Sequence, residues 1–305
     1  MKHLLKISDL SVDEFNALIS LTEKLKNETK KGISHKLLAG KTLGMIFAKS
    51  STRTRVSFEV GMYQLGGMPL FLSSSDIQLG RGESIYDTAN VLSRYLDGIM
   101  IRTFLQSDVE QLAEYGKVPV INGLTDDHHP CQALADLFTL YEHKNRLKGL
   151  KLAYVGDGNN VAHSLAEACA LAGMEFCAAS PAGYECRADI IEHAKELAKT
   201  TDGKITVTND PEEAVNDADA VYTDTWVSMG QEKEKEERIK VFMPYQVNKK
   251  LFSHAKEDAV FLHCLPAYRG FEMTEEIIDS PFSVVFDEAE NRLHAQKAVM
   301  VSLMS

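Results

Sequence analysis

The chain has 305 residues, enough for about two domains. With 44% hydrophobic and 25% charged residues, it can bury a sizeable core. Its formal charge of −11 argues against a nucleic-acid-binding protein, which needs a basic face, and suits a soluble cytoplasmic protein.

The N-terminal residues and the cysteines point to the same compartment. Residues 1–7 are too few and too interrupted by charge for a signal peptide, and no apolar run approaches the ~20 residues of a membrane-spanning helix. The five cysteines form an odd set without metal-ligand spacing. We therefore expect free thiols in a reducing compartment, no metal and no membrane.

The first half of the chain alternates strands and helices. Ser11-Val-Asp-Glu14 is a capping box that opens a helix. The apolar run 43–48 predicts a strand, and 56–67 predicts an amphipathic helix closed by two glycines. The elements that follow are strand 68–72, helix 84–94, strand 97–102, helix 107–115, strand 118–122 and helix 129–145.

The pattern restarts near residue 148. The charged run 232–238 is most simply a solvated helix face, and the stretch 288–304 is helical with an apolar side. The predicted elements are strand 151–156, a helix to about residue 173, strand 174–180, helix 188–199, strand 205–208, helix 211–216, and strands 218–224, 260–263 and 284–286.

This alternation predicts an α/β fold of two doubly wound parallel-sheet domains, residues 1–147 and 148–305. Ligands of such sheets collect at the carboxyl ends of the strands. Polar residues follow several strands closely, so we expect them to converge on one interdomain cleft: Ser51, Arg102, His129, Asn160, Asp224 and Cys264.

The segment 49–55 carries four hydroxyls and two arginines where a helix begins. Free N–H groups and the positive end of the helix dipole favour an anion there, and Arg53 offers a planar fork for two phosphate oxygens. An anionic ligand in an acidic protein also needs a locally basic site, which suggests that Arg53, Arg55 and Arg102 cluster. The plain alternative is an ordinary N-cap with solvated arginines.

Two further candidates have plain alternatives as well. Arg102 ends a buried strand and could instead form an ion pair at the sheet edge. Gly156-Asp-Gly-Asn-Asn160 superficially resembles a dinucleotide turn, but it lacks the third glycine and a clear acid about 20 residues on. A tight turn that presents Asn160 to a substrate is the better interpretation.

Four motifs together carry a resemblance that spans most of the chain: Ser51-Thr-Arg-Thr-Arg55, His129-Pro-Cys-Gln132, Asp224-Thr-Trp-Val-Ser-Met-Gly230 and His263-Cys-Leu-Pro266. They occur in the order found in the aspartate and ornithine carbamoyltransferases, and the last two are similar to the ornithine branch. Arg81 stands where the aspartate enzymes carry a lysine, which weakens that alternative.

The resemblance implies a first domain that binds carbamoyl phosphate. Thr54, Arg102 and His129 would stabilise the oxyanion, and Gln132 would hold the carbamoyl NH₂ group. A cis Leu265–Pro266 bond would aim carbonyl groups at that NH₂ group, and Gln78 would reach a neighbouring subunit's site. The implied carbamoyl-phosphate-binding residues are Ser51, Thr52, Arg53, Thr54, Gln78, Arg102, His129, Gln132, Cys264, Leu265 and Arg292.

The resemblance also implies an amino-acid-binding second domain, and a last helix (about 288–304) that packs back on the first domain. Cys264 would sit beside the reacting amine, and the ornithine contacts would be Asn160, Asp224, Ser228 and Met229. The implied reaction carbamoylates ornithine without a cofactor, in a homotrimer or an assembly of trimers. Putrescine or aspartate as substrate, or a non-catalytic relative, remain alternatives.

Overall fold

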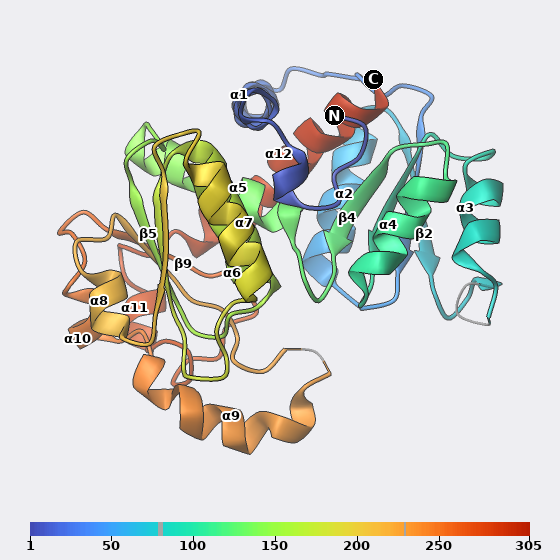
Figure 1. Cartoon of the computed structure of the whole chain (residues 1–305). Coiled ribbons are helices and arrows are strands. Elements are labelled where there is room, and N and C mark those ends of the chain that lie inside the picture. The colour runs from blue at the N-terminus through green and yellow to red at the C-terminus, as the bar shows by residue number, and fades with distance from the viewer. Residues whose placement is uncertain (79–81, 229) are drawn as a thin grey trace. The chain divides into compact units, whose positions relative to one another are not determined.

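The computed structural model describes residues 1–78, 82–228 and 230–305. It divides the chain into two compact units: residues 1–138 with 290–305, and residues 139–289. Each unit contains one parallel β-sheet flanked by helices, as the sequence predicts (Figure 1). None of the helices in the described ranges combines the length and apolar character needed to cross a bilayer.

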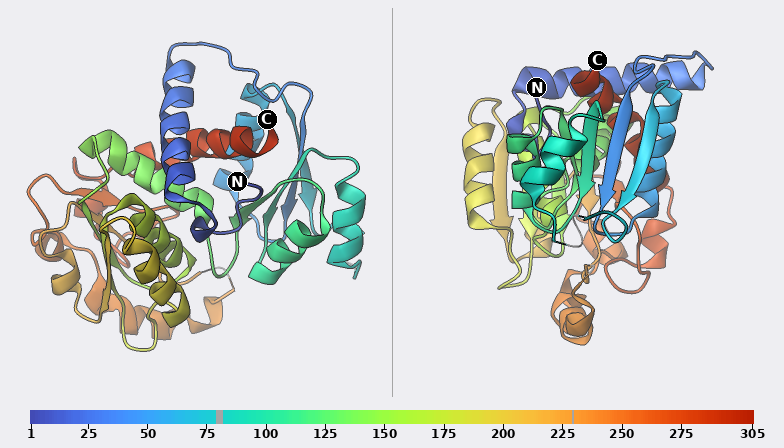
Figure 2. Two further views of the ribbon diagram at one scale, coloured as in Figure 1. Left: turned by 45° about the horizontal axis from the view of Figure 1, so that its top comes forward. Right: turned by 90° about the vertical axis from the view of Figure 1, so that its right-hand side faces the viewer.

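The first unit is built on a sheet with strand order β2-β1-β3-β4, all parallel. Its helix α2 covers one face of the sheet, and α3 and α4 pack together on the other (Figure 2). The elements are η1 (Ile7–Asp9), α1 (Val12–Lys30), β1 (Thr42–Phe47), α2 (Thr52–Gln64), β2 (Met68–Ser73), α3 (Ile85–Leu92), β3 (Gly98–Arg102), α4 (Gln106–Tyr115), β4 (Val120–Leu124) and α5 (Pro130–Lys144), whose last residues belong to the second unit.

The second unit has strand order β7-β6-β5-β8-β9, again all parallel. Helices α6 and α7 pack on one face of this sheet, and α8 and α10 lie on the other (Figure 1). The elements are β5 (Lys151–Val155), α6 (Asn160–Ala172), β6 (Glu175–Ala179), α7 (Ala188–Ala198), β7 (Lys204–Thr208), α8 (Pro211–Val215), β8 (Ala220–Tyr222), η3 (Glu232–Glu234), α9 (Lys235–Phe242), η4 (Met243–Tyr245), α10 (Lys249–Phe252), β9 (Val260–Leu262) and α11 (Glu275–Ile278). The last helix, α12 (Val285–Met304), begins in the second unit and belongs to the first from residue 290.

In both sheets the chain adds strands first on one side of its first strand and then on the other side. The chain leaves β1 toward β2 on one side and later returns to add β3 on the other side; in the second sheet β5 and β8 have the same relation. A crevice opens at such a switch point, beyond the carboxyl ends of the two strands. Each unit therefore has one place where the fold itself favours a ligand: after β1 and β3 in the first, and after β5 and β8 in the second.

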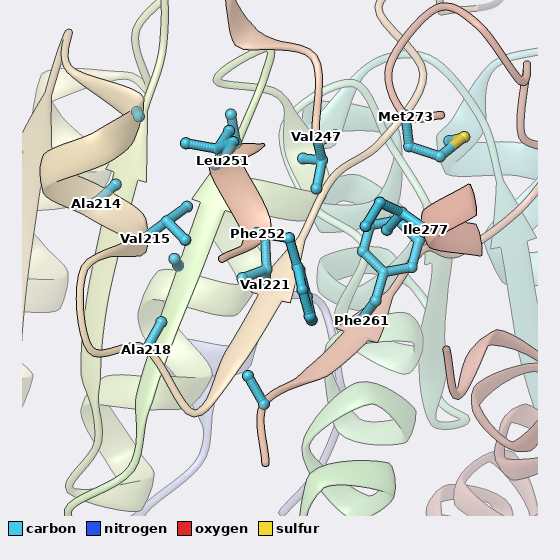
Figure 3. Packing of buried hydrophobic residues seen from close by; sticks show 14 of the residues in the cluster. Ala214, Val215, Ala218, Val221, Val247, Leu251, Phe252, Phe261, Met273 and Ile277 are labelled. Atoms are coloured by element: carbon cyan, nitrogen blue, oxygen red, sulfur yellow. The ribbon is translucent and has the colours of Figure 1, made fainter. Parts of the chain in front are cut away.

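Each unit has its own apolar core. In the first, Ile46, Ile99 and Ile101 from the sheet pack with Val109 and Leu112 of α4. The second has a larger cluster in which Val221 and Phe261 from the sheet meet side chains of α8, α10 and α11 (Figure 3). In each unit, strands that end at the switch point contribute side chains to an apolar cluster of that unit.

The C-terminal helix differs from the prediction at its start. We expected a strand at residues 284–286 and a helix from 288, but α12 begins at Val285. Only Ser283 makes an isolated bridge, with Phe261. The apolar run Val284-Val285-Phe286 is short, and a run of this length does not distinguish a strand from a buried helical turn. The predicted return of the last helix is confirmed, because residues 290–305 belong to the first unit.

Candidate active site

The loop after β1 ends in a helix N-terminus, as its residue types predict. Ser51 is the N-cap of α2, and its Oγ accepts a hydrogen bond from the Thr54 N–H at 3.2 Å. Thr54 is buried, Arg53 is half-buried and Thr52 is exposed. The first turn of α2 therefore presents backbone N–H groups and hydroxyls at the switch point of the first sheet, which is the arrangement that binds phosphate.

Arg102 lies at the other side of the same switch point. It is the last residue of β3, pairs in register with Phe47 of β1 and is 9% exposed. Its carbonyl oxygen accepts from the Ala48 N–H at 2.8 Å, which holds the two strand ends together. A buried guanidinium thus lies close in the fold to the phosphate-type loop, as the strand positions predict.

Arg292 links three parts of the first unit. Its Nη1 donates to Gln132 Oε1 at 2.6 Å, and its Nη2 donates to Thr54 Oγ1 at 2.9 Å. Gln132 Nε2 in turn donates to Asp136 Oδ1 at 2.7 Å. The Gln132 amide is thereby oriented, with its oxygen toward Arg292 and its nitrogen toward Asp136, and Thr54, Gln132 and Arg292 form one buried group from α2, α5 and α12.

His129 directly precedes α5 and lies near the guanidinium groups of Arg292 and Arg102. Burial, followed by the charges of Arg292 and Arg102, lowers the pKa of His129 well below its usual 6.5. The imidazole is therefore neutral at pH 7 and has one N–H to donate. A neutral histidine beside two arginines suits the stabilisation of a developing oxyanion without a competing proton transfer.

Of the three arginines expected to cluster, Arg55 has its contacts elsewhere. Arg55 is turned toward Glu59, with its Nε 3.0 Å from Glu59 Oε1, and its guanidinium stacks 3.7 Å from the Phe71 ring centroid. A buried lysine that sequence reasoning missed, Lys49, instead pairs with Asp126 and lies 4.3 Å from the centre of the Phe104 ring. The prediction failed for Arg55 because its carboxylate partner is one helical turn along α2.

In the second unit, Asp224 follows β8 and is buried. Its Oδ2 accepts from Asn159 Nδ2 at 2.8 Å, and its Oδ1 accepts from the Thr225 N–H at 2.8 Å and from the Cys264 thiol at 3.1 Å. Asp224, Cys264 and the turn after β5 therefore meet at the switch point of the second sheet. These three donors fix the orientation of the buried Asp224 carboxylate.

Asn159, which the sequence analysis did not single out, makes the contact with Asp224. Its Oδ1 caps α6 by accepting from the Val161 and Ala162 N–H groups at 2.9 and 3.2 Å, and this fixes its NH₂ group toward Asp224. Asn160 is the first residue of α6 and is half-buried. The N-cap preference of asparagine could have singled out Asn159 from the sequence.

The segment after β9 presents Cys264 and an unusual backbone. The Leu265–Pro266 peptide is cis, as the resemblance implies, and Leu265 has a left-handed φ of 57°. His263 is fully buried, with Nδ1 accepting from the Leu265 N–H at 2.9 Å and Nε2 lying 3.2 Å from Glu272 Oε1. These bonds hold the Leu265 backbone in place.

One atom each of Asp224, His263 and Cys264 lie within 4.8 Å of one another, a grouping that could hold a metal ion. All three side chains already have hydrogen-bond partners: Cys264 donates to Asp224, and His263 uses both ring nitrogens. A metal would have to break these bonds. The described residues include all five cysteines, and no disulfide joins any two of them.

The loop after Asp224 is anchored by a buried arginine. Arg238 of α9 donates from Nε to the Trp226 carbonyl at 2.6 Å and pairs with Asp157, next to the turn after β5. Burial raises the pKa of Asp157 to about 6, while the Arg238 charge lowers it by less. The prediction of a solvated helix for residues 232–238 is thus wrong at Arg238, because its guanidinium lies 4.9 Å from the Tyr184 ring centroid instead of in water.

Three further predicted site residues are Ser228 and Met229, which follow the anchored segment, and Gln78 of the first unit. Ser228 is half-buried, and its N–H donates to Gln231 Oε1 at 3.0 Å; Met229 lies outside the described residues. Gln78 is exposed, and its carbonyl accepts from the Glu83 N–H at 3.1 Å. Gln78 is thus available at the surface of the first unit.

Comparisons with known proteins cover both units. Residues 2–142 match the family description "Aspartate/ornithine carbamoyltransferase, carbamoyl-P binding domain", and residues 148–303 match "Aspartate/ornithine carbamoyltransferase, Asp/Orn binding domain". The chain belongs to the aspartate/ornithine carbamoyltransferase family. The two matches divide the chain as its two sheets do.

Individual members of this family are similar over nearly the whole chain. An ornithine carbamoyltransferase of Caldicellulosiruptor saccharolyticus is 59% identical, over 99% of this chain and 98% of the relative. One from Thermococcus kodakarensis is 57% identical, over 99% and 96%. The solved structure of ornithine carbamoyltransferase from Pyrococcus furiosus has a TM-score of 0.97 and 55% identity, covering 99% of this chain and 97% of the other.

Several residues that support the predicted site residues were not identified from the sequence. The residues that sequence reasoning missed, namely Asn159, Asp136 and the Asp157–Arg238 pair, orient predicted residues or their loops and contain no motif of their own. Asp136 lies one helical turn after Gln132 in α5, whereas the other contacts join residues distant in the chain. Asn159 also left a local signal, as a helix cap.

Proposed function

We propose that this carbamoyltransferase-family chain transfers the carbamoyl group of carbamoyl phosphate to the side-chain amine of L-ornithine, giving L-citrulline and phosphate. The observation that carries the proposal is the 57–59% identity, over 99% of the chain, to several proteins named ornithine carbamoyltransferase. The charge distribution at the two switch points supports it, with cations in the first unit and a carboxylate in the second.

Carbamoyl phosphate binds in the first unit in this proposal. The N–H groups and hydroxyls of Ser51, Thr52 and Thr54, with the forks of Arg53 and Arg102, hold the phosphate oxygens. Their support is the capped start of α2 and the neighbouring end of β3. Two guanidinium groups match phosphate bidentately, which a lysine does not.

The carbamoyl group lies between the neutral His129 and the oriented Gln132. His129, Arg102 and Thr54 donate to the carbonyl oxygen as negative charge develops on it, and Gln132 Oε1 accepts from the carbamoyl NH₂ group. Arg292 holds Thr54 and Gln132 in these positions before the substrate arrives. Leu265 supplies a backbone carbonyl to the same NH₂ group, and Cys264 lies beside the incoming amine.

The chemistry needs no redox step. The ornithine ammonium first loses one proton to solvent, and the neutral nitrogen attacks the carbonyl carbon. The tetrahedral species then collapses, the C–O bond to phosphate breaks, and the second proton of the nitrogen passes to the departing phosphate. Donors preorganised for the oxyanion are the largest expected contribution. Because the amine resembles that of lysine, with a pKa of ~10.4, it must lose a proton before attack.

Ornithine binds in the second unit in this proposal. Asp224 accepts the α-ammonium group, while Asn160 and backbone N–H groups near Ser228 and Met229 hold the α-carboxylate. The buried, oriented carboxylate of Asp224 supports the first contact. Closure of the Ser228 loop over the amino acid completes the site, with the loop held at its base by Arg238.

The assembly and compartment are also proposals. We infer a homotrimer, or an assembly of trimers, in which the exposed Gln78 reaches a neighbouring subunit's carbamoyl phosphate, and a cytoplasmic enzyme. The functional domains are residues 1–147, which bind carbamoyl phosphate, and 148–305, which bind ornithine. Sedimentation equilibrium tests the assembly: a monomer that is fully active at assay concentration contradicts the shared site.

The deciding experiment is a colorimetric assay of the carbamoylated product with purified protein, carbamoyl phosphate and three amines. Ornithine is expected to give citrulline with kcat/KM far above those for putrescine and aspartate. Preference for putrescine or aspartate would overturn the substrate assignment. No product with any amine, but tight binding of carbamoyl phosphate, would identify a non-catalytic relative.

A further inference from the structure

A buried lysine lies in the first unit, apart from the residues assigned to carbamoyl phosphate. Lys297 of α12 is 0% exposed. Its Nζ donates to Thr29 Oγ1 at 2.8 Å, to His35 Nε2 at 2.9 Å and to Gln64 Oε1 at 3.0 Å. These partners come from the end of α1, the segment after it and the end of α2, so the ammonium joins four parts of the unit.

All three partners of this ammonium are neutral acceptors. His35 must accept through Nε2, so its proton is on Nδ1, which faces Glu28 Oε2 at 3.1 Å. The His35 ring therefore lies between the Glu28 carboxylate and the Lys297 ammonium. Among the residues that the structure describes, no carboxylate forms an ion pair with the Lys297 ammonium.

A buried charge without a counter-charge is costly, and proteins normally pair such groups. Burial lowers the pKa of Lys297 to about 8, and Glu28 raises it by less. Other positive charges lie nearby, because burial and then the charges of Lys297, Lys26 and Lys30 lower the pKa of His294 to about 3. The ammonium is thus mostly charged at pH 7 in surroundings that favour an additional anion.

A cavity of about 670 Å³ opens beside this cluster. Its wall includes Thr29, His35 and Gln64, the same side chains that hold Lys297, together with Ile33, Lys36 and Tyr63. Lys297 itself lies behind this wall and is fully buried. The volume falls in the range of ligand sites, roughly 300–1,000 Å³. An anion that takes the place of one neutral acceptor would exchange a neutral hydrogen bond for a charge-assisted one, which is about twice as strong.

We propose that this cavity binds a small organic anion that displaces the Gln64 side chain from Lys297. Its carboxylate or phosphate group then pairs with the Lys297 ammonium while its body contacts Tyr63 and Ile33. The exposed ring of Tyr63 and the exposed side chain of Ile33 provide apolar contact at the mouth. The site is separate from the residues assigned to carbamoyl phosphate, and the inference does not depend on the reaction proposed above.

The test is isothermal titration calorimetry at pH 7 with three probes: benzoate, phenyl phosphate and the neutral benzyl alcohol. At least one acid is expected to bind the wild type at millimolar concentration or better, and benzyl alcohol is not. The acid that binds identifies the headgroup as carboxylate or phosphate. Failure of both acids to bind, or equal binding of the alcohol, overturns the proposal.

Two variants separate this cavity from the carbamoyl-phosphate loop. Lys297→Met is expected to weaken binding of the acid at least tenfold, whereas Arg53→Ala, which removes an arginine of that loop, leaves it unchanged. The reverse pattern, with loss in Arg53→Ala and none in Lys297→Met, would show that the probe binds the loop and would overturn the inference.

Gln64→Glu tests the same idea without removing the lysine, should Lys297→Met fail to fold. It puts a carboxylate oxygen at the position of Gln64 Oε1, which is 3.0 Å from Lys297 Nζ. The protein then supplies its own counter-charge. The variant is expected to bind the acid at least tenfold more weakly and to unfold at a higher temperature than the wild type in the absence of the acid. Unchanged affinity for the acid in Gln64→Glu contradicts the proposed pairing.

Discussion

The two switch-point groups are built from opposite charges. In the first unit, Arg102, Arg292 and the start of α2 gather donors, and His129 is neutral between them. In the second unit, the centre is an acceptor, Asp224, surrounded by neutral donors. Each half is thus preorganised for one charge type, and the net charge of −11 predicts neither.

This difference leads to a separation of roles. A change in the first group should affect the step in which charge grows on the carbamoyl oxygen, whereas a change in the second should affect which amine is selected. Variants of the two groups should therefore differ in which kinetic constant they change.

Arg102→Lys keeps the charge of the first group but loses the planar fork. Removal of one well-placed donor to an oxyanion costs on the order of 10²–10³-fold in kcat, and we expect a loss of that size with little change in melting temperature. Steady-state kinetics at saturating substrates measures it. Arg55→Lys is the matched control, because Arg55 pairs with Glu59 and should be nearly silent. An unchanged kcat would remove Arg102 from the mechanism.

Asp224→Ala tests the second group. The variant is expected to lose roughly 10–100-fold in kcat/KM for ornithine. Sites whose polar groups are left unpaired can reject a substrate by ~10⁴-fold, but here water can fill the gap, so the expected loss is smaller. Its preference for ornithine over putrescine should narrow. Asp279→Ala, an exposed carboxylate of the same unit that pairs with Arg269, is the control. Full retention of the ornithine preference would exclude Asp224 from binding the α-ammonium group.

The pH dependence should differ between the two substrates. If only the neutral amine attacks, the apparent KM for ornithine should fall close to tenfold per pH unit between 7 and 9, below the amine pKa of ~10.4. The KM for carbamoyl phosphate should change much less, because the first group holds arginines and a histidine that is already neutral at pH 7. A flat ornithine KM across this range contradicts the proton requirement.

The smallest effect concerns the stability of the first unit. The pKa of Lys297 is about 8 when folded, below its ordinary value, so between pH 8 and about 10.4 the unfolded chain binds the proton that the folded chain has lost. This group therefore makes the free energy of unfolding rise with pH in that window, by at most about 1.4 kcal/mol per unit. Lys297→Met should remove that rise. Denaturant melts at pH 8, 9 and 10 measure it, and equal slopes for both proteins would contradict it.

Local patterns predicted what depends on local chemistry. Ser51 as an N-cap and Arg102 at a strand end follow from residue type and position, and both are found where expected. Because parallel strands end at one edge, the approach of Asp224 to the turn after β5 followed from topology as well, although the contact is made by Asn159.

Contacts between distant residues could not be predicted. The charged run containing Arg238 has the composition of a solvated helix, and only the tertiary structure brings Asp157, Tyr184 and the Trp226 carbonyl around its guanidinium. Lys297 likewise occupies a helix position that no pattern marks as buried. Its three acceptors lie more than 200 residues earlier in the chain.

The position of α12 determines which of the two units can finish folding first during synthesis. The first unit needs residues 290–305: Leu293, Lys297 and Met300 pack against Gly61, and Met304 packs against Gly98. On a ribosome that adds 5–20 residues per second, these residues follow residue 138 only after roughly ten to thirty seconds. The second unit, by contrast, is contiguous in the chain and complete at residue 289. The unit that is synthesised first should therefore be the last to finish folding, and until residues 290–305 leave the ribosome the surface that α12 covers stays exposed to chaperones.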